Sequence, residues 1–232
     1  MLDNNIKKYK INLLNLYLKL IKGKKMIEFK NVSVSYSKAY FALYNVSVKF
    51  EKDCINVVYG IFGAGKTTLL RCIAGLENYT GEILFNGKDI KLLDYSKNFN
   101  VCYIPTVPVF FENKTILKNI IYALKVRCGK FEKDDIIRQL KNFGFDNENE
   151  KVKYLSFFQK VKLSLFRAKF RKVDVLLIGQ VFDNLKEEEK QELDKIIKEF
   201  FSNSLIIVTT ENKKEFFKDC NRVKLDCGIL KN

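Results

Sequence analysis

A glycine-rich segment in the first third of the chain has residue types and spacing suited to binding phosphate. Its residues are, in order, Gly60, Ile61, Phe62, Gly63, Ala64, Gly65, Lys66, Thr67 and Thr68. They match the pattern G-x-x-x-x-G-K-[ST], in which glycines let the backbone curl so that successive N–H groups face a phosphate. The N-terminus of the following helix adds partial positive charge. Lys66 is expected to reach the β- and γ-phosphates and the Thr67 hydroxyl to bind Mg²⁺, so the segment predicts a nucleoside triphosphate site.

The sequence around this loop predicts the strand and the helix that the motif requires. An apolar run at 55–59 comes directly before the loop, and a helical stretch over 66–76 follows it. Further strands are predicted at 27–34, 46–50, 82–85, 173–178 and 205–208, and helices at 116–145, 156–170 and 186–201. Strands that alternate with helices predict an α/β fold with a mostly parallel sheet, and the middle third is the expected helical insertion.

Composition narrows the chemistry further. The chain has 42 Lys and Arg against 27 Asp and Glu, a net charge of +15, which indicates an anionic partner such as nucleotide, nucleic acid or a membrane surface. It has no histidine, which excludes histidine zinc sites, Ser-His triads and imidazole acid–base chemistry. The six cysteines form no C-x-x-C pair, so a disulfide or metal framework is not expected and a reducing compartment fits.

The first 25 residues differ from the rest of the chain. They hold seven lysines, one aspartate and a cluster of leucines and isoleucines. One interpretation is a basic amphipathic helix on a membrane surface. The other is an upstream extension, because Met26 opens a segment that reads like a natural start. Residues 26–232 are expected to form one domain, and no stretch approaches the roughly 18–20 apolar residues that span a bilayer.

The residues beyond the phosphate loop resemble the nucleotide-binding domain of ABC transporters. The resemblance runs from Met26 to about Leu230, and it is carried by 69–76, 80–83, 86–90, 103–105, Pro108, Phe111, 115–116, Asn119 and 221–228. It implies a P-loop NTPase fold with a mostly parallel central sheet, an antiparallel β subdomain near the N-terminus and a helical subdomain at about 107–170.

The resemblance also implies how the domain would work. Two such domains sandwich two ATP molecules, each between the phosphate loop of one chain and the signature motif of the other, and membrane subunits dock near the helical insertion. Tyr36 stands where the family has an aromatic residue that stacks on adenine, a contact worth about 1–3 kcal/mol by analogy with base stacking on aromatic side chains.

Two departures from the family lie in the signature and in the loop after 103–105. The family has Leu-Ser-Gly-Gly-Gln, whereas this chain has Leu155, Ser156, Phe157, Phe158 and Gln159. The glycines let backbone N–H groups approach the γ-phosphate of the partner's ATP, and the two phenylalanines add bulk there. Thr106 replaces a Gln that contacts the metal or the attacking water, and it is too short to span the same distance.

The remaining departures follow the predicted buried strands. Gly179 replaces the Asp that helps to hold Mg²⁺, and Gln180 replaces the Glu that acts as general base. Gln has a similar size but cannot accept a proton. Lys186 stands where Asp is usual, and Thr210 replaces the His that contacts the γ-phosphate. All of these changes lie on the γ-phosphate or hydrolysis side, while the phosphate loop is intact.

These features lead to the hypothesis of an ATP-binding subunit of an ABC transporter complex. It would bind ATP and Mg²⁺, with hydrolysis weak or lost, at the cytoplasmic face of the cell membrane. The expected partners are transmembrane permease subunits and a second nucleotide-binding domain, in a hetero- or homodimer.

Two alternatives stay open. One is an active ATPase with unusual residues, for which Glu187 and Glu211 are displaced candidates for the lost base. The other is a nucleotide-independent structural or regulatory subunit. A basic run within 151–172 is interpreted as a solvated helix face or one facing acidic head groups, in preference to a nucleic-acid site.

Overall fold

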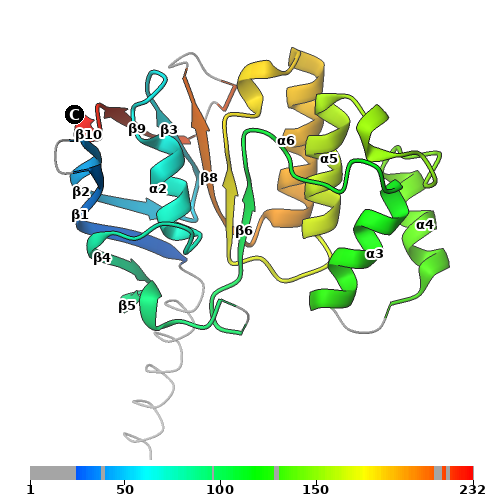
Figure 1. Ribbon diagram of the computed structural model, residues 1–232, viewed down its shortest axis with the longest axis horizontal. Coiled ribbons are helices and arrows are strands. Elements are labelled where there is room, and N and C mark those ends of the chain that lie inside the picture. The colour runs from blue at the N-terminus through cyan, green and yellow to red at the C-terminus, as the bar shows by residue number, and fades with distance from the viewer. Residues whose placement is uncertain are drawn as a thin grey trace, which may run out of the picture.

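The computed structural model describes residues 25–37, 40–95, 97–127, 131–211, 216–217 and 220–231. Except for Lys25, the N-terminal segment for which an amphipathic helix or an upstream extension was expected lies outside these residues. Two sheets and five α-helices make up the described part (Figure 1).

One sheet is antiparallel and comes mostly from the first quarter of the chain. Its strand order is β2-β1-β4-β5, with β1 at Met26–Ser37, β2 at Tyr40–Glu51, β4 at Thr80–Phe85 and β5 at Lys88–Asp89. Ile27 and Phe29 are buried along β1, and after a shift in register with β2 so are Val32 and Val34, as expected for a strand with one buried face.

The second sheet is the mostly parallel one. Its order is β10-β9-β3-β8-β7-β6, with β3 at Ile55–Tyr59, β6 at Val101–Ile104, β7 at Val175–Ile178, β8 at Leu205–Thr210, β9 at Cys220–Asp226 and β10 at Ile229–Lys231. The strands from β9 to β6 pair in parallel, and β10 adds an antiparallel edge.

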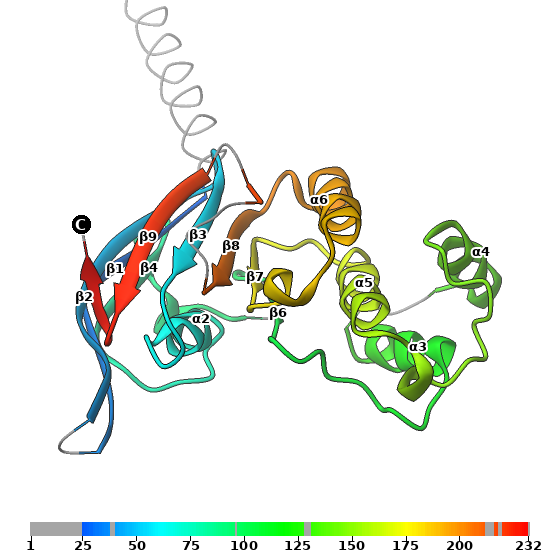
Figure 2. The ribbon, with the colours of Figure 1, turned by 90° about the horizontal axis from the view of Figure 1, so that it is seen from above.

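The helices cover this sheet on both faces. They are α2 at Lys66–Ile73, α3 at Ile116–Arg127, α4 at Lys133–Asn142, α5 at Phe157–Ala168 and α6 at Glu187–Phe201. Figure 2 shows α5 and α6 on the side of β7 and β8 away from the antiparallel sheet, with α3 and α4 beyond α5. Val175 and Leu177 of β7 join the core shared with α2 and the antiparallel sheet, whereas Leu176 and Ile178 join the core shared with α5 and α6. This two-sided burial explains the continuous apolar run of the sequence and confirms the predicted fold class.

Several predicted element boundaries differ in the structure, among them those of α2 and β7. Helix α2 ends at Ile73 rather than at residue 76, because Gly75 adopts a left-handed φ of 70°. The Leu76 N–H then donates to the Arg71 carbonyl at 2.9 Å and the Gly75 N–H to the Cys72 carbonyl at 3.2 Å, which is the Schellman arrangement. Strand β7 begins at Val175 rather than at residue 173.

Asp174, just before β7, ties three segments together. Its side chain is 12% exposed and lies 2.9 Å from the Lys25 ammonium. It also accepts a hydrogen bond of 3.1 Å from the Asn100 N–H. Burial alone would raise the pKa of Asp174, but the hydrogen bonds from Lys25 and Asn100 and the nearby lysine charges outweigh burial and lower that pKa.

We predict that Asp174→Asn lowers the free energy of unfolding by about 1–3 kcal/mol at neutral pH, because it weakens a buried charged hydrogen bond. The folded-state pKa of Asp174 lies below its ordinary 3.8. Its stabilisation is therefore complete above that ordinary value and is lost as the pH falls through the lower folded value. Urea unfolding should show the difference between the two proteins narrowing in acid. The exposed Asp146→Asn change is the control, and an equal loss in both variants would contradict the prediction.

Candidate nucleotide-binding site

The phosphate loop joins the end of β3 to the start of α2, at the carboxyl edge of the parallel strands. Gly63 and Gly65 have φ angles of 79° and 99°, in the left-handed region that favours glycine. A Cβ atom at Gly65 would also collide with the carbonyl oxygen of Ala42 on β2, and one at Gly60 with the carbonyl oxygen of Leu225 on β9. The glycines of the motif are thus required both by backbone conformation and by the close approach of both sheets.

Lys66 lies under this loop and is almost completely buried, with 3% exposure. Its ammonium donates hydrogen bonds to the carbonyl oxygens of Gly60 at 2.6 Å and Ile61 at 2.8 Å. Burial lowers the pKa of Lys66, while the negative charges of Glu211 and Asp183 act in the opposite direction. A buried ammonium needs such partners because desolvation disfavours an unpaired charge.

A cavity of about 200 Å³ opens beside the loop. It is lined by Tyr36, Tyr40, Ala42, Phe62, Gly63, Ala64, Gly65, Lys66, Thr67, Thr68 and Gln180. Of the residues predicted to bind nucleotide, Gly60 and Ile61 are not in this lining, although their carbonyl oxygens hold Lys66. The sequence did not single out Tyr40 and Ala42, which belong to β2, because only the pairing of β1 with β2 brings them to the loop.

Tyr36 is fixed at the mouth of the cavity through its hydroxyl group. The hydroxyl donates to Glu77 Oε2 at 3.0 Å and lies 3.4 Å from Thr68 Oγ1. Glu77 in turn accepts a hydrogen bond from Arg71 Nε at 3.0 Å. Burial and the Glu77 carboxylate raise the pKa of the Tyr36 hydroxyl, partly offset by Thr68 and Arg71. Tyr36 as a whole is 56% exposed, which leaves room for a base to stack on its ring.

The departures at the ends of β6 and β7 form one packed unit. A Cβ atom at Gly179 would lie 2.5 Å from the backbone nitrogen of Thr106 and 3.0 Å from its Oγ1. The Gln180 N–H donates to the same Thr106 Oγ1 at 3.3 Å. A carboxylate side chain at residue 179 would therefore require the backbone of Thr106 to move, and the two replacements belong together sterically.

A second group of polar residues follows β7 and β8. The Thr210 hydroxyl donates to Asp183 Oδ1, and the Glu211 N–H donates to Asp183 Oδ2 at 2.8 Å. The Gln180 amide donates to Glu211 Oε1 at 3.0 Å. The carbonyl oxygen of Thr210 also accepts the Gly60 N–H at 3.2 Å, which attaches this group to the phosphate loop.

The signature residues lie on α5 and not at the cavity of their own chain. Ser156 caps α5, since its Oγ accepts the Gln159 N–H at 3.2 Å and its own N–H donates to Gln159 Oε1 at 2.8 Å. Phe157 and Phe158 form the first turn and pack half-buried against the core, as Leu155 does more completely. The capped helix start survives the loss of both glycines. Lys186 similarly stands at the N-terminus of α6.

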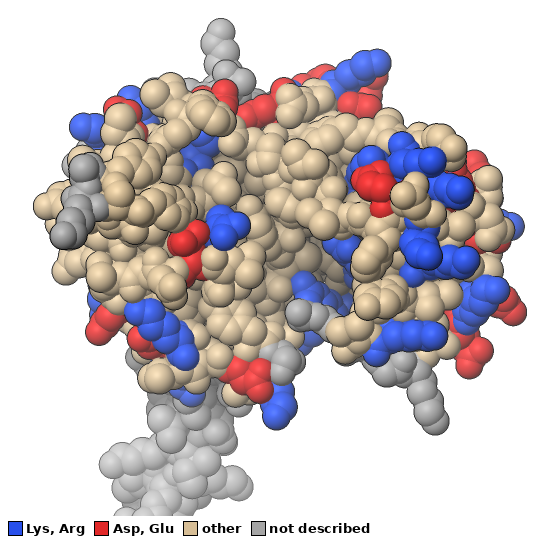
Figure 3. All heavy atoms as spheres, in the orientation of Figure 1, with Lys and Arg blue, Asp and Glu red and all other residues tan. Residues whose placement is uncertain are grey.

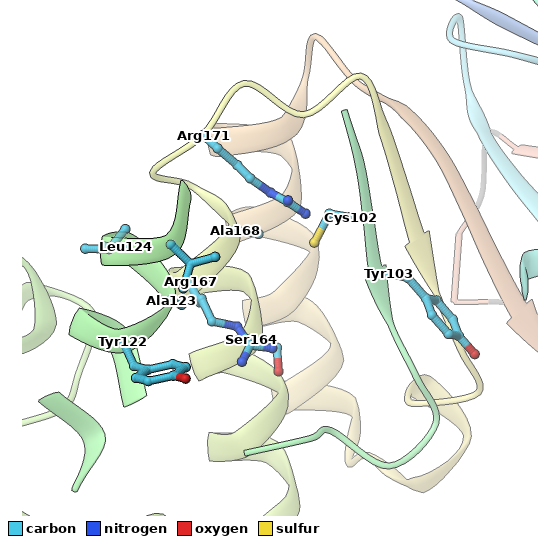
Figure 4. A pocket seen from close by; sticks show the side chains of 10 residues that line it. Cys102, Tyr103, Tyr122, Ala123, Leu124, Ser164, Arg167, Ala168 and Arg171 are labelled. Carbon is cyan, nitrogen blue, oxygen red and sulfur yellow. The ribbon is translucent and has the colours of Figure 1, made fainter. Parts of the chain in front are cut away.

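A separate hollow of about 330 Å³ lies between β6, α3 and α5, and Figure 4 shows Tyr122, Arg167 and Arg171 around it. Arg171 donates to the Val101 carbonyl at 2.9 Å. Exposed apolar residues lie in the segments around it, namely Val107, Val109, Phe111, Tyr122 and Val126. Figure 3 shows many Lys and Arg side chains over the helical half of the face in view. Within the described ranges, no helix has the length and hydrophobicity to span a bilayer.

A family model and the relatives found by comparison with known proteins point to the same family. The family model described as "ABC transporter" matches residues 43–182. The molybdate/tungstate import ATP-binding protein WtpC of Methanocaldococcus jannaschii is 34% identical over 179 residues, which cover 74% of this chain and 59% of that protein. The methionine import ATP-binding protein MetN of Clostridioides difficile is 30% identical over 214 residues, covering 86% and 65%. The chain thus spans about 59–65% of the length of these two relatives.

Solved structures agree on the fold. A putative ABC transporter ATP-binding protein from Pyrococcus furiosus superposes with a TM-score of 0.70 at 19% identity, covering 85% of this chain and 96% of that chain. The ATP-binding subunit of another ABC transporter has a TM-score of 0.73 at 21% identity, with coverage of 89% and 88%. From the matched family model, the intact phosphate loop and these relatives, we conclude that the chain belongs to the ABC transporter family, as a nucleotide-binding domain.

Proposed function

We propose that this chain is the ATP-binding subunit of an ABC import system that binds nucleotide but hydrolyses it weakly or not at all. The observation that carries the proposal is an asymmetry within one site. The phosphate loop and its buried Lys66 are complete, whereas the contact between Gly179 and Thr106 closes the space where a metal-binding carboxylate would stand. The import direction is suggested by the names of the relatives.

The loop is suited to a triphosphate chain. The N-terminus of α2 and the curled backbone provide N–H donors and partial positive charge. The Lys66 ammonium lies against two carbonyl oxygens, which phosphate oxygens can replace as acceptors. Tyr36 offers an exposed ring for the adenine base, and Tyr40 lies on the same cavity wall.

The fit to Mg²⁺ is partial. Thr67 is an exposed residue on the first turn of α2, where its hydroxyl can hold a metal ion together with nucleotide oxygens. Gly179 contributes no ligand, and the described residues contain no group of three or more Asp, Glu, Cys or His side chains suited to a metal. When bound, Mg²⁺ would neutralise charge on the β- and γ-phosphates.

Proton removal from water is the step that this chain lacks. Gln180 stands at the position of the base, and its amide donates to Glu211. Because an amide cannot accept a proton under these conditions, the loss corresponds to a typical decrease in rate of about 10²–10⁴. Thr210 is likewise engaged with Asp183.

The proposed partners are membrane subunits and a second nucleotide-binding domain, at the cytoplasmic face of the membrane. The hollow between β6, α3 and α5 combines exposed apolar side chains with Arg167 and Arg171, a mixture typical of protein interfaces. The capped start of α5 would face the partner's nucleotide, with Phe157 and Phe158 only partly turned into the core.

We predict that Mg-ATP raises the stability of the parent protein and not of Lys66→Ala. A ligand at 100 times its Kd stabilises the native state by about 2.7 kcal/mol. Thermal unfolding checks this, with the exposed Lys88→Ala as the matched control, which should retain the shift. A folded parent protein that shows no shift would support the nucleotide-independent structural subunit instead.

We also predict that Gly179→Ala destabilises the fold by about 1–3 kcal/mol, because the added methyl group overpacks against Thr106. At a permissive backbone position the same change would stabilise by about 0.4–1 kcal/mol. Urea unfolding tests the prediction through the sign of the change in the free energy of unfolding. A variant more stable than the parent protein would show that residue 179 has room for a side chain.

We predict that a membrane subunit binds at the hollow between β6, α3 and α5. A photo-crosslinking phenylalanine analogue in place of Val126 should give an adduct with an integral membrane protein in the native cell. The same analogue in place of Ile229, which is exposed on β10, should not. Mass spectrometry identifies the adducts, and crosslinking of both positions to the same soluble protein would count against this surface.

A further inference from the structure

Two carboxylates, Asp183 and Glu211, are hydrogen-bonded to Thr210 and Gln180, the positions that the family resemblance assigns to the γ-phosphate side. Glu211 accepts the amide of Gln180 at 3.0 Å, and Gln180 lines the phosphate cavity. Asp183 is joined to Thr210, whose carbonyl oxygen accepts the Gly60 N–H at 3.2 Å. Both negative charges are close enough to Lys66 to raise the pKa of its ammonium against the effect of burial.

Hydrogen bonds hold these carboxylates in place. Asp183 accepts from the Thr210 hydroxyl through one oxygen and from the Glu211 N–H, at 2.8 Å, through the other. Glu211 is fixed from two sides, because its backbone donates to Asp183 and its side chain accepts from Gln180.

The described lining of the phosphate cavity supplies little positive charge to balance them. Among the described residues that line the phosphate cavity, Lys66 alone carries a cationic side chain. Gly179 has no side chain, and Thr106, Gln180 and Thr210 are neutral. A γ-phosphate would therefore bring its own negative charge towards two fixed anions, whereas the α- and β-phosphates stay in the loop and at the start of α2.

We infer that Asp183 and Glu211 make this site bind nucleoside diphosphates more tightly than triphosphates. The inference rests on the proposed nucleotide binding and specifies which nucleotide the site retains. The subunit would then hold ADP for longer than ATP, and ADP would occupy its phosphate loop within the transporter complex.

The opposite role is also chemically possible for such a pair. If Asp183 and Glu211 acted as ligands of Mg²⁺ in the triphosphate complex, their charge would favour Mg-ATP. Neutralising Glu211 therefore changes ATP affinity in opposite directions under the two roles, which makes the sign of the effect decisive.

The test is calorimetric titration of the full chain with ADP and with ATP, each with Mg²⁺ and with EDTA. The variant is Glu211→Gln, which keeps the size of the side chain and an oxygen that accepts from Gln180. Asp183→Asn is the second variant. Glu188→Gln is the matched control, because Glu188 is an exposed carboxylate in the first turn of α6 and does not line the phosphate cavity.

We expect the parent protein to bind ADP about tenfold more tightly than ATP, equivalent to about 1.4 kcal/mol. Glu211→Gln should strengthen ATP binding more than ADP binding and bring the ratio of the two Kd values towards one. Glu188→Gln should leave that ratio unchanged. Asp183→Asn should move the ratio in the same direction as Glu211→Gln.

Three results would overturn the inference. ATP binding at least as tight as ADP binding in the parent protein would contradict the preference while leaving the proposed nucleotide binding intact. Weaker Mg-ATP binding by Glu211→Gln would assign the carboxylates to the metal. Failure of the folded parent protein to bind either nucleotide would overturn both the preference and the proposed function.

Discussion

The close approach of both sheets to the phosphate loop is the constraint on which the site depends. Gly65 touches the carbonyl oxygen of Ala42 in the antiparallel sheet, and Gly60 touches that of Leu225 in the parallel sheet. The turn between β9 and β10 completes the contact, because the Gly228 N–H donates to the Ala64 carbonyl at 3.1 Å and the Tyr44 N–H to the Gly228 carbonyl at 2.8 Å. The loop can keep its curl and bury Lys66 only while the sheets hold this spacing.

The site has two sides with different chemistry, the phosphate loop on one and the ends of β6 and β7 on the other. On the loop side, backbone N–H groups and a buried ammonium suit a phosphate chain. On the strand-end side, Gly179 packs against Thr106, and Gln180 is held between Thr106 and Glu211. Under the proposed function, these neutral groups and carboxylates take the place of a metal ligand and a base, so that nucleotide binding would be retained without the groups that activate water.

Motif spacing and hydrophobic runs predicted the local parts of this arrangement. The glycine pattern located the loop between β3 and α2, and the apolar stretch ending at Ile178 predicted the strand β7. Both signals are local, since each depends on the residues of one element. The sequence did not predict the early end of α2. That end depends on the Schellman hydrogen bonds from Gly75 to Cys72 and from Leu76 to Arg71, which only the structure shows.

Contacts between distant segments could not be predicted in this way. Tyr40 reaches the cavity through the register of β1 and β2. The link from Gln180 to Glu211 joins residues 31 positions apart on two strand ends, and in the sequence Glu211 stands only as a displaced candidate for a base. Likewise, Thr106 and Gly179 are two independent replacements in the sequence, and only the structure shows that their backbones lie in close contact.

The central claim is that nucleotide binding and hydrolysis are separated in this chain. The most direct measurement is phosphate release from saturating Mg-ATP by a preparation whose nucleotide affinity has been determined on the same sample, with Lys66→Ala beside it. We predict saturable binding by the parent protein and phosphate release no faster than that of the variant. Release well above the Lys66→Ala background, with saturation at the measured Kd, would contradict it and identify an active ATPase.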